Sequence, residues 1–466
     1  MSRAHAEVFD RPTGWRRHYY HPVTQVSMLG LVCFMCPGMF LALTGLGGGG
    51  QVNGTVQANA SAILYSTFVF FGLFSGSINN FLGPRRTLML GTWGYSLYIA
   101  SFLAVSIHPG AGASAFVEAA GAILGICAAL LWTAQGSLMM AYPTEAQKGM
   151  FVSISWSIMS LGGVLGSAVS FGTNFNNTAN SVSTGTYVIF LIVTLIGVFL
   201  PLLMANPDNM IRTDGTRVNQ VSHTSWKTEL FSLYVALKTD PWIILLFPMF
   251  LASNFCYAWE YNDYNGAIFT IRARSLNNVM SWTAQIFGSV LIGYFILDQK
   301  TVRRRVRAFY GWTLVFFMVF VAHVWAYFYQ KTYIRAETGA KDAYKIDIMD
   351  ENYVPHVWLM IFHGFLDSMW QTYAYWLMGA MSNDPAKLAV FTGFYKSLQS
   401  AGAAGIYRAD AVGISYMNIF LSTWCLMVAG MVFSAPMVYL RVTDHTDEDK
   451  TLMEVEPPAA ATPEKA

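Results

Sequence analysis

The sequence predicts an all-α polytopic membrane protein with twelve transmembrane helices in two six-helix bundles. The first reason is composition: 54% of the 466 residues are hydrophobic and 12% are charged, against about 25% charged residues in soluble domains. The second reason is that apolar runs of about 20 residues, the length of a bilayer-spanning helix, recur along the chain. The third reason is that sequence landmarks of the first half return in the second half.

The predicted spans follow one another with mostly short connections. The mean hydropathy of +0.40 leaves too few polar side chains to cover a water-exposed surface. The net charge of +2 indicates no nucleic-acid partner, so the lipid bilayer is the expected surrounding. We place the spans at residues 23–45, 57–79, 87–107, 114–141, 150–171, 186–205, 242–262, 277–297, 308–330, 356–381, 388–407 and 413–440.

The longest connection between spans divides them six and six. Its polar sequence is typical of a cytosolic linker, and the acidic C-terminal segment has the composition of a disordered tail. The predicted organisation is a cytosolic N-terminal segment (1–22), an N-terminal six-helix bundle (23–206), the linker (207–241), a C-terminal six-helix bundle (242–440) and the acidic cytosolic tail (441–466).

Two independent signals orient the chain with both termini in the cytosol. Of its 28 Lys and Arg residues, this arrangement puts 20 in cytosolic segments, 7 in outer loops and Lys396 inside a span, as the positive-inside rule requires. It also puts the N-glycosylation acceptors Asn53, Asn59 and Asn176 outside. An acceptor site permits a glycan but does not require one. The chain is predicted to be a multi-pass protein of the plasma membrane or of an endomembrane.

A glycine run at the end of the first span matches a nucleotide-binding pattern. Gly45, Gly47 and Gly50 of "GLGGGGQ" fit G-x-G-x-x-G, which binds a dinucleotide only where a strand precedes it and a helix follows. Here an apolar helix precedes the run and an outer loop follows. We therefore expect the flexible outer end of the first span, where glycine lets backbones turn or pack closely.

The two halves share landmarks at matching positions. "GSINNFLGPRR" (76–86) follows the second span and "GYFILDQKTVRRR" (293–305) follows the eighth; Trp132 with Trp370 and Pro143 with Pro385 also correspond. Parallel six-helix repeats of this kind are typical of the major facilitator architecture.

The first of these loops resembles the inner-loop motif of that superfamily, a glycine, an acid, a glycine and a basic pair. Asn80 stands where the acid is expected, and Asp298 lies one position late in the second copy. The loop is therefore either a variant gate or a set of basic anchors for anionic lipid headgroups. The residues of this cytosolic loop motif are Gly76, Asn80, Gly83, Arg85 and Arg86.

Five segments carry a more specific resemblance: "FMCPGMFLALTGLGGGGQ" (34–51), "INNFLGPRR" (78–86), "LLWTAQGSLMMAYPTEAQKG" (130–149), "ASNFCYAWEYND" (252–263) and "FTGFYKSLQSAGAAGIYRADA" (391–411). They are similar to the Unc-ninety-three-like family of ion channel regulatory proteins, particularly its fungal branch. The resemblance runs from about Trp15 to Leu440, and at Leu41 it implies Asn instead. It implies a major facilitator fold but not transport, since some animal relatives regulate potassium channels or escort receptors through the secretory pathway.

Ionisable residues inside the spans are the leading candidates for function, because they are costly in lipid. His363, Asp367 and Gln371 lie at i, i+4 and i+8 on one face of the tenth span. Lys396 lies inside the eleventh span, with Gln399 one turn on. We expect an ion pair between Asp367 and Lys396, serving either as a proton- or substrate-responsive switch or as a static bridge between helices.

The seventh span ends in "NFCYAWEYNDYN", which is unusually polar for a continuous lipid-facing helix. Asn254, Tyr257 and Tyr261 share a face at helical spacing, and Glu260 and Asp263 are expected to approach the outer surface. We expect them to line a central cavity where the helix unwinds; the alternative is an aromatic belt at the membrane interface. In the first half, Trp132 and Gln135 are the matching cavity candidates.

No Ser/His/Asp set, metal-spaced histidine cluster or phosphate loop stands out in the sequence. We therefore expect neither an enzyme nor a cofactor or metal. The favoured function is transport of a small-molecule solute by alternating access between the two halves. The alternative is a non-transporting regulator or trafficking escort that binds another membrane protein, such as an ion channel.

Overall fold

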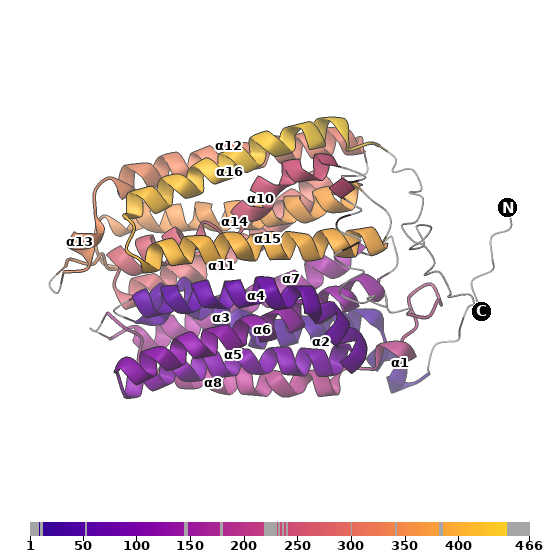
Figure 1. The fold of residues 1–466 in the computed structure, drawn as a ribbon, viewed down its shortest axis with the longest axis horizontal. Helices are drawn as coiled ribbons and strands as arrows, with labels where there is room; N and C mark the ends of the chain where they lie inside the picture. The colour runs from indigo at the N-terminus through magenta and orange to yellow at the C-terminus, as the bar shows by residue number, and fades with distance from the viewer. Residues whose placement is uncertain are drawn as a thin grey trace, which may run out of the picture.

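The structure, a computed structural model, describes residues 9, 13–51, 54–143, 148–177, 180–218, 231, 234, 237–238, 241–299, 301–340, 343–381 and 385–444. Long helices run side by side along the longest axis of the molecule (Figure 1). The helices of the first half gather on one side and those of the second half on the other. We call the two ends of the bundle the α1 end and the α13 end, after the short helices that lie there.

The first half is built from long helices joined by tight connections. Gly83 separates two of them and adopts a φ of +78°, a conformation that favours glycine. The helices are α1 (Trp15–Tyr19), α2 (Pro22–Met35), α3 (Pro37–Gly45), α4 (Thr55–Leu82), α5 (Pro84–Ile107), α6 (Ala111–Ala141), α7 (Lys148–Asn174) and α8 (Thr184–Phe199), with 3-10 turns η1 (Gly48–Gly50), η3 (Leu200–Leu203) and η4 (Pro207–Asn209).

The second half repeats the pattern but begins with a broken segment. A 3-10 turn, η5 (Pro241–Leu246), leads into α10 (Phe247–Ala252) and then into a π-helix, η6 (Ala258–Gly266). The remaining elements are α11 (Ile271–Ile292), the π-turn η7 (Gly293–Leu297), α12 (Arg304–Gln330), α13 (Arg335–Thr338), α14 (Tyr353–Met381), α15 (Pro385–Ala411) and α16 (Tyr416–Leu440).

Nine helices in the described part of the chain are long and apolar enough to cross a membrane. The chain is therefore a multi-pass integral membrane protein with an all-helical fold. Most predicted spans lie inside an observed helix; for example, the predicted span 114–141 lies within Ala111–Ala141.

Span 186–205 passes from α8 into η3 and span 277–297 passes from α11 into η7, and two further predicted spans are broken well inside their length. Span 23–45 divides into α2 and α3 at Cys36, directly before Pro37, whose ring and missing N–H disturb the helix that precedes it. Span 242–262 divides into η5, α10 and the π-helix η6. Residues 253–256 form turns and residues 258–266 form the π-helix, so the expected unwinding is limited to a short break. Turns of π-helix are frequent at functional sites.

The two halves meet along α4 with α15 and along α7 with α11. Hydrogen bonds cross this boundary toward the α13 end, and two of those given below use the glycine run. The crossing bonds include Gly48 N to Asn262 Oδ1 (2.8 Å), Asn265 Nδ2 to Gly45 O (2.8 Å), Asn278 Nδ2 to Ala42 O (2.8 Å) and Arg408 Nη1 to Asn59 Oδ1 (2.8 Å).

Gly47 explains why this boundary needs glycine. A Cβ atom at Gly47 would lie 2.2 Å from the carbonyl oxygen of Tyr261 and 2.6 Å from the Cα of Gly266. The glycine run therefore packs closely at the boundary between the halves and is not the flexible outer end that the sequence predicted, because residues 45–50 are all buried.

Candidate functional site

A cavity of about 90 Å³ lies between the two halves of the molecule. Its first-half wall comes from α3, α4, α5, α6 and α7, and its second-half wall from the turn after α10 and from α11, α14 and α15. Among the residues predicted from the sequence, the cavity brings together Trp132, Asn254, Tyr257, Gln371, Lys396 and Gln399.

The predicted ion pair between Asp367 and Lys396 is not formed, although both side chains belong to the described residues. The Asp367 carboxylate instead accepts hydrogen bonds from Tyr257 Oη (2.9 Å) and Gln371 Nε2 (3.0 Å). On the other side, Lys396 Nζ donates to Gln399 Oε1 (2.9 Å). The prediction was wrong because helical periodicity gives the depth of each residue but not the rotation of two helices about their axes.

Gln371 and Gln399 connect the Asp367 carboxylate to the Lys396 ammonium group. Gln399 Nε2 donates to Gln371 Oε1 at 3.4 Å and to Asn254 Oδ1 at 2.7 Å. An unbroken chain of side-chain hydrogen bonds therefore runs from Asp367 through Gln371 and Gln399 to Lys396. Such networks are polarised inside a low-dielectric interior, so a ligand that changes the contacts at one end changes the electrostatics at the other.

Aromatic rings surround the Lys396 ammonium group. Its Nζ lies 5.2 Å from the ring centroid of Trp132, 5.6 Å from that of Tyr375 and 5.5 Å from that of Tyr395. Ring faces attract a cation at these distances. The rings and Gln399 thus hold a charge at the cavity wall with no carboxylate in contact with it among the described side chains.

A second, smaller cavity of about 10 Å³ lies deeper in the second half. Glu260, His363 and Asp367 contribute to its wall together with Ser253 and Cys256. Glu260 is 1% exposed, and the Nε2 atom of His363 is buried with no hydrogen-bond partner among the described residues. The cavity has room for about one water molecule, which could bridge these groups.

Some predicted residues lie outside both cavities. Tyr261 is buried and stacks on Tyr257 with ring centroids 5.0 Å apart, and Gln135 is half-buried on α6. The alternative of an interfacial aromatic belt is not supported for η6, because Trp259, Tyr261 and Tyr264 are each at most 1% exposed.

Sequence reasoning missed several residues of the main cavity. Gln285 was the most recognisable, since it is a polar residue within the apolar predicted span 277–297. The aromatic and aliphatic residues gave no signal of their own, because the same side chains are common on lipid-facing surfaces. The missed lining residues include Phe40, Leu41, Tyr95, Trp156, Trp282 and Gln285.

The loop motif of residues 76–86, which the sequence predicts to be cytosolic, has a structural role in this fold. Gly76 is buried on α4, Asn80 is exposed near its end, and Gly83 forms the turn into α5. Arg85 donates to the carbonyl oxygens of Pro201 (3.4 Å) and Leu202 (2.5 Å), where a cation satisfies the free carbonyls at the end of a helix. Arg86 is exposed, so of the basic pair it is the more accessible one.

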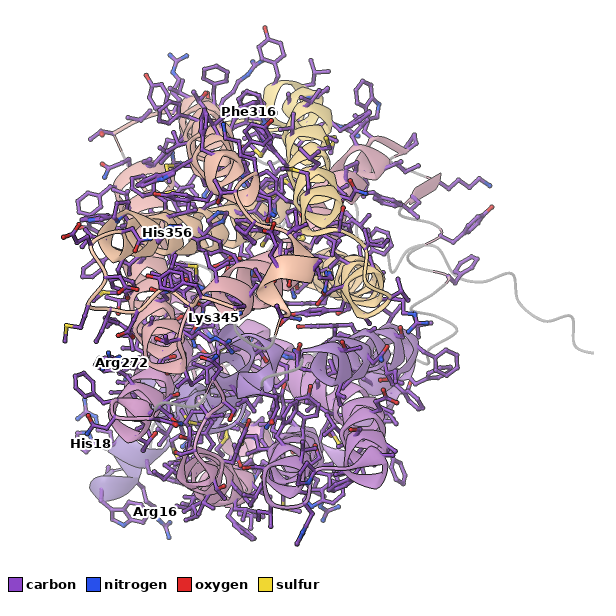
Figure 2. The ribbon with its side chains drawn as sticks, turned by 90° about the vertical axis from the view of Figure 1, so that its left-hand side faces the viewer. Arg16, His18, Arg272, Phe316, Lys345 and His356 are labelled. Atoms are coloured by element: carbon purple, nitrogen blue, oxygen red, sulfur yellow. The ribbon has the colours of Figure 1, made fainter. Side chains whose placement is uncertain are left out.

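Charged groups join the loops at the α13 end, onto which Figure 2 looks. Arg272, labelled there with Lys345 and His356, donates from Nε to Asp347 Oδ1 at 2.6 Å. That hydrogen bond lowers the pKa of Asp347 to about 2. Burial lowers the pKa of Lys345 to about 8, and its ammonium group donates to the carbonyl oxygens of Ala267 and Thr338.

The three acceptor asparagines differ in their surroundings. Asn176 is exposed just after α7, at the α13 end. Asn59 lies inside α4, where its side chain accepts a hydrogen bond from Arg408. Asn53 lies outside the described residues. Of the two described sites, Asn176 is the better placed for a glycan.

Solved transporters share this fold. The chain superposes on a D-xylose-proton symporter with a TM-score of 0.61 at 13% sequence identity, covering 91% of this chain and 98% of the symporter. At this identity the similarity concerns the fold, which is of the major facilitator type.

Sequence relatives give the family. The chain is 42% identical over 424 residues to an UNC93-like protein of Schizosaccharomyces pombe, covering 91% of this chain and 83% of the relative. It is 38% identical over 441 residues to UNC93-like protein 1 of Arabidopsis thaliana, covering 93% of each chain. The family model described as ion channel regulatory protein UNC-93 matches residues 51–434. The chain therefore belongs to the UNC-93 family.

Proposed function

We propose that this protein is a secondary transporter that moves a small solute by alternating access. The observation that carries the proposal is the cavity between the halves, which both halves line with side chains and which is sealed toward the α13 end by hydrogen bonds and the glycine contact. Rocking the halves about this cavity would open it to either side in turn.

The finer topology belongs to the same proposal. In addition to the nine helices described above, α14 and α15 have 29 and 27 residues, which at 1.5 Å per residue gives roughly 40 Å, enough to cross a bilayer. With the broken segment from η5 to η6, this makes twelve crossings in two six-helix bundles, residues 23–206 and 242–440. Both termini are then cytosolic and the α13 end faces outward.

The hydrogen-bonded chain from Asp367 to Lys396 is proposed to couple the cavity to the packing of the second half. Asp367 binds Tyr257 and Gln371, so it ties α14 to the π-helical segment. A solute that draws Lys396 or Gln399 toward itself would disturb these contacts. The site needs no metal or cofactor for this role, and none of its steps is enzymatic.

A second candidate function is regulation or trafficking of another membrane protein. The matching family model favours it, since its description names regulation of ion channels. In that case the same bundle would bind a partner and the cavity would be static.

Solute uptake tests transport directly. We would reconstitute the full chain in proteoliposomes and measure uptake of radiolabelled sugars, amino acids and organic acids, with Asp367→Asn as the matched variant. We expect uptake of at least one solute by the wild type and a loss of at least about tenfold in the variant, because the neutral amide removes the charge to which Tyr257 and Gln371 donate. Size-exclusion profiles would establish that the variant folds.

Crosslinking tests the alternating-access step separately. Asn59→Cys on α4 and Arg408→Cys on α15, in a Cys425→Ser background, would be joined across the boundary by a cleavable bismaleimide. We expect joining the pair to stop uptake and cleavage to restore it, while reagent on either single cysteine has little effect. Absence of uptake for every solute, together with a membrane protein that co-purifies at a fixed ratio, would favour the regulator.

A further inference from the structure

The main cavity has two chemically different walls, one from each half. None of its lining residues from the first half is an amide or carries a charge; they include Phe40, Leu41, Phe68, Trp132, Trp156 and Met159. The second half contributes the amides and the cation: Asn254, Gln285, Gln371, Gln399 and Lys396. A ligand that satisfies both walls must be polar at one end and apolar at the other.

The polar wall carries a positive charge with unused hydrogen-bonding capacity. An ammonium group has three donors, and among the described residues Lys396 Nζ makes one hydrogen bond, to Gln399 Oε1. The Trp132, Tyr375 and Tyr395 rings around it are acceptors only through their faces. The nearest carboxylate in the network, Asp367, is reached only through the two glutamines.

We propose that the solute is an amphipathic organic anion, a carboxylate attached to a small apolar or aromatic body. The carboxylate would bind Lys396 and neighbouring amide groups, and the body would pack on the aromatic wall of the first half. This inference rests on the proposed function, because it takes the cavity between the halves as the solute site.

Other solute classes fit the two walls less well. An organic cation would meet the Lys396 charge, and the ring faces that could attract it already hold that ammonium group. A sugar carries hydroxyl groups on every side, yet the first-half wall offers only the hydroxyls of Tyr65 and Tyr95 and the indole N–H groups of Trp132 and Trp156. Burying unpaired hydroxyls against the remaining apolar side chains is unfavourable.

Binding of three matched probes to the purified full chain tests the inference. The probes are 3-phenylpropionate, its neutral amide and the cationic 3-phenylpropylamine, which share a phenyl ring and differ in charge. At pH 7.5 we expect the anion to bind at least about tenfold more tightly than the amide, and the amine to bind most weakly.

Variants of Lys396 test whether this residue causes the preference for the anion. Lys396→Gln should remove the preference for the anion over the amide, whereas Lys396→Arg should keep most of it. Lys331→Gln is the matched control, because Lys331 is exposed and lies beyond the end of α12. Equal or tighter binding of the amide or the amine, an anion preference that survives in Lys396→Gln, or no binding of any probe would overturn the inference.

This test separates the inference from the proposed function. An anion preference that depends on Lys396, in a protein that takes up no solute, would refute transport and leave the ligand class standing. Uptake of a sugar or a cation with no binding of 3-phenylpropionate would support transport and refute the proposed ligand class.

Discussion

Gly47 shows how much one residue can decide in this molecule. Its φ of +75° favours glycine, and its missing Cβ leaves space for the carbonyl oxygen of Tyr261 from the other half. The sequence predicted a flexible outer end where backbones turn or pack closely, and it did not indicate the partner. Which backbone would approach could not be predicted, because the contact joins residues more than 200 positions apart and depends on how the halves dock.

Replacing Gly47 with Ala should destabilise the closed α13 end. An alanine with positive φ costs about 1 kcal/mol, and overlap with Tyr261 O would add roughly 1–3 kcal/mol. Gly413→Ala is a matched control, because Gly413 also has a positive φ (+80°) but a Cβ there would meet nothing within 4 Å. In thermal unfolding we expect the melting temperature to fall further for Gly47→Ala; equal losses would mean that the close contact contributes nothing.

We predict that the ionisation of Asp347 makes the stability of the α13 end depend on pH. The Arg272 hydrogen bond lowers its pKa to about 2, below the ordinary value of about 3.9, so folding favours the ionised form. This stabilisation is fully present above about pH 4 and is lost as the pH falls toward 2. Asp347→Asn should therefore lower the melting temperature at pH 7, with a difference from wild type that narrows at pH 3.

The matched control for that experiment is Glu351→Gln, since Glu351 is exposed on the same loop. It should leave the melting temperature nearly unchanged at both pH values. A difference between Asp347→Asn and wild type that stays constant from pH 7 to pH 3 would contradict the proposed role of the Arg272 pair.

At the scale of elements, the sequence predicted helices well and their interruptions partly. Hydropathy located the spans because lipid requires every backbone polar group to be satisfied within the helix. The density of polar residues in the seventh predicted span indicated an interrupted helix there, where η6 lies. Nothing in the sequence indicated how α14 and α15 are rotated relative to each other. For this reason the candidate residues Asp367 and Lys396 were found, but their direct pairing was wrong and the glutamine bridge was missed.

We predict that the short helix α13 holds α15 and η6 together. Its Arg335 donates from Nη2 to Asp410 Oδ1 of α15 at 2.8 Å and to Asp263 Oδ1 of η6 at 3.3 Å. The two carboxylates are 5% and 1% exposed at the side chain, while the arginine is 32% exposed. Removing the cation would leave two buried carboxylates close together without a counter-charge.

Arg335→Gln should therefore destabilise the protein by about 2 kcal/mol, a value reduced from that of fully buried pairs because solvent reaches the arginine. Arg335→Lys should lose less, since it keeps the charge. Arg305→Gln serves as the control; Arg305 lies at the α1 end and caps the carbonyl oxygen of Tyr439. Thermal unfolding of the three variants would check this prediction. A loss of stability for Arg335→Gln no larger than that for Arg305→Gln would show that α13 does not hold α15 and η6 together.

At the scale of the whole molecule, two similar halves enclose one asymmetric site. The repeated landmarks predicted the division, and the two walls show what each half contributes: aromatic surface from the first, amides and charge from the second. Even matching landmarks differ in use. Trp132 lines the cavity, whereas Trp370 is buried and donates its indole N–H to Ser253 Oγ at 3.0 Å. The similar architecture of the two halves therefore does not fix which side chains face the cavity.

The orientation of the molecule in its membrane yields the last prediction. If the α13 end faces outward, Asn176 is exposed on the side where glycans are attached, while Asn59 is engaged with Arg408 inside α4. In a eukaryotic host, a variant that keeps only Asn176 should shift on a gel after glycosidase treatment, and one that keeps only Asn59 should not. A C-terminal tag should resist protease until the membrane is permeabilised. A tag cleaved in intact cells would place the α13 end in the cytosol instead, and the seal formed by Gly47, Asn262 and Asn265 would then close the cavity toward the inside.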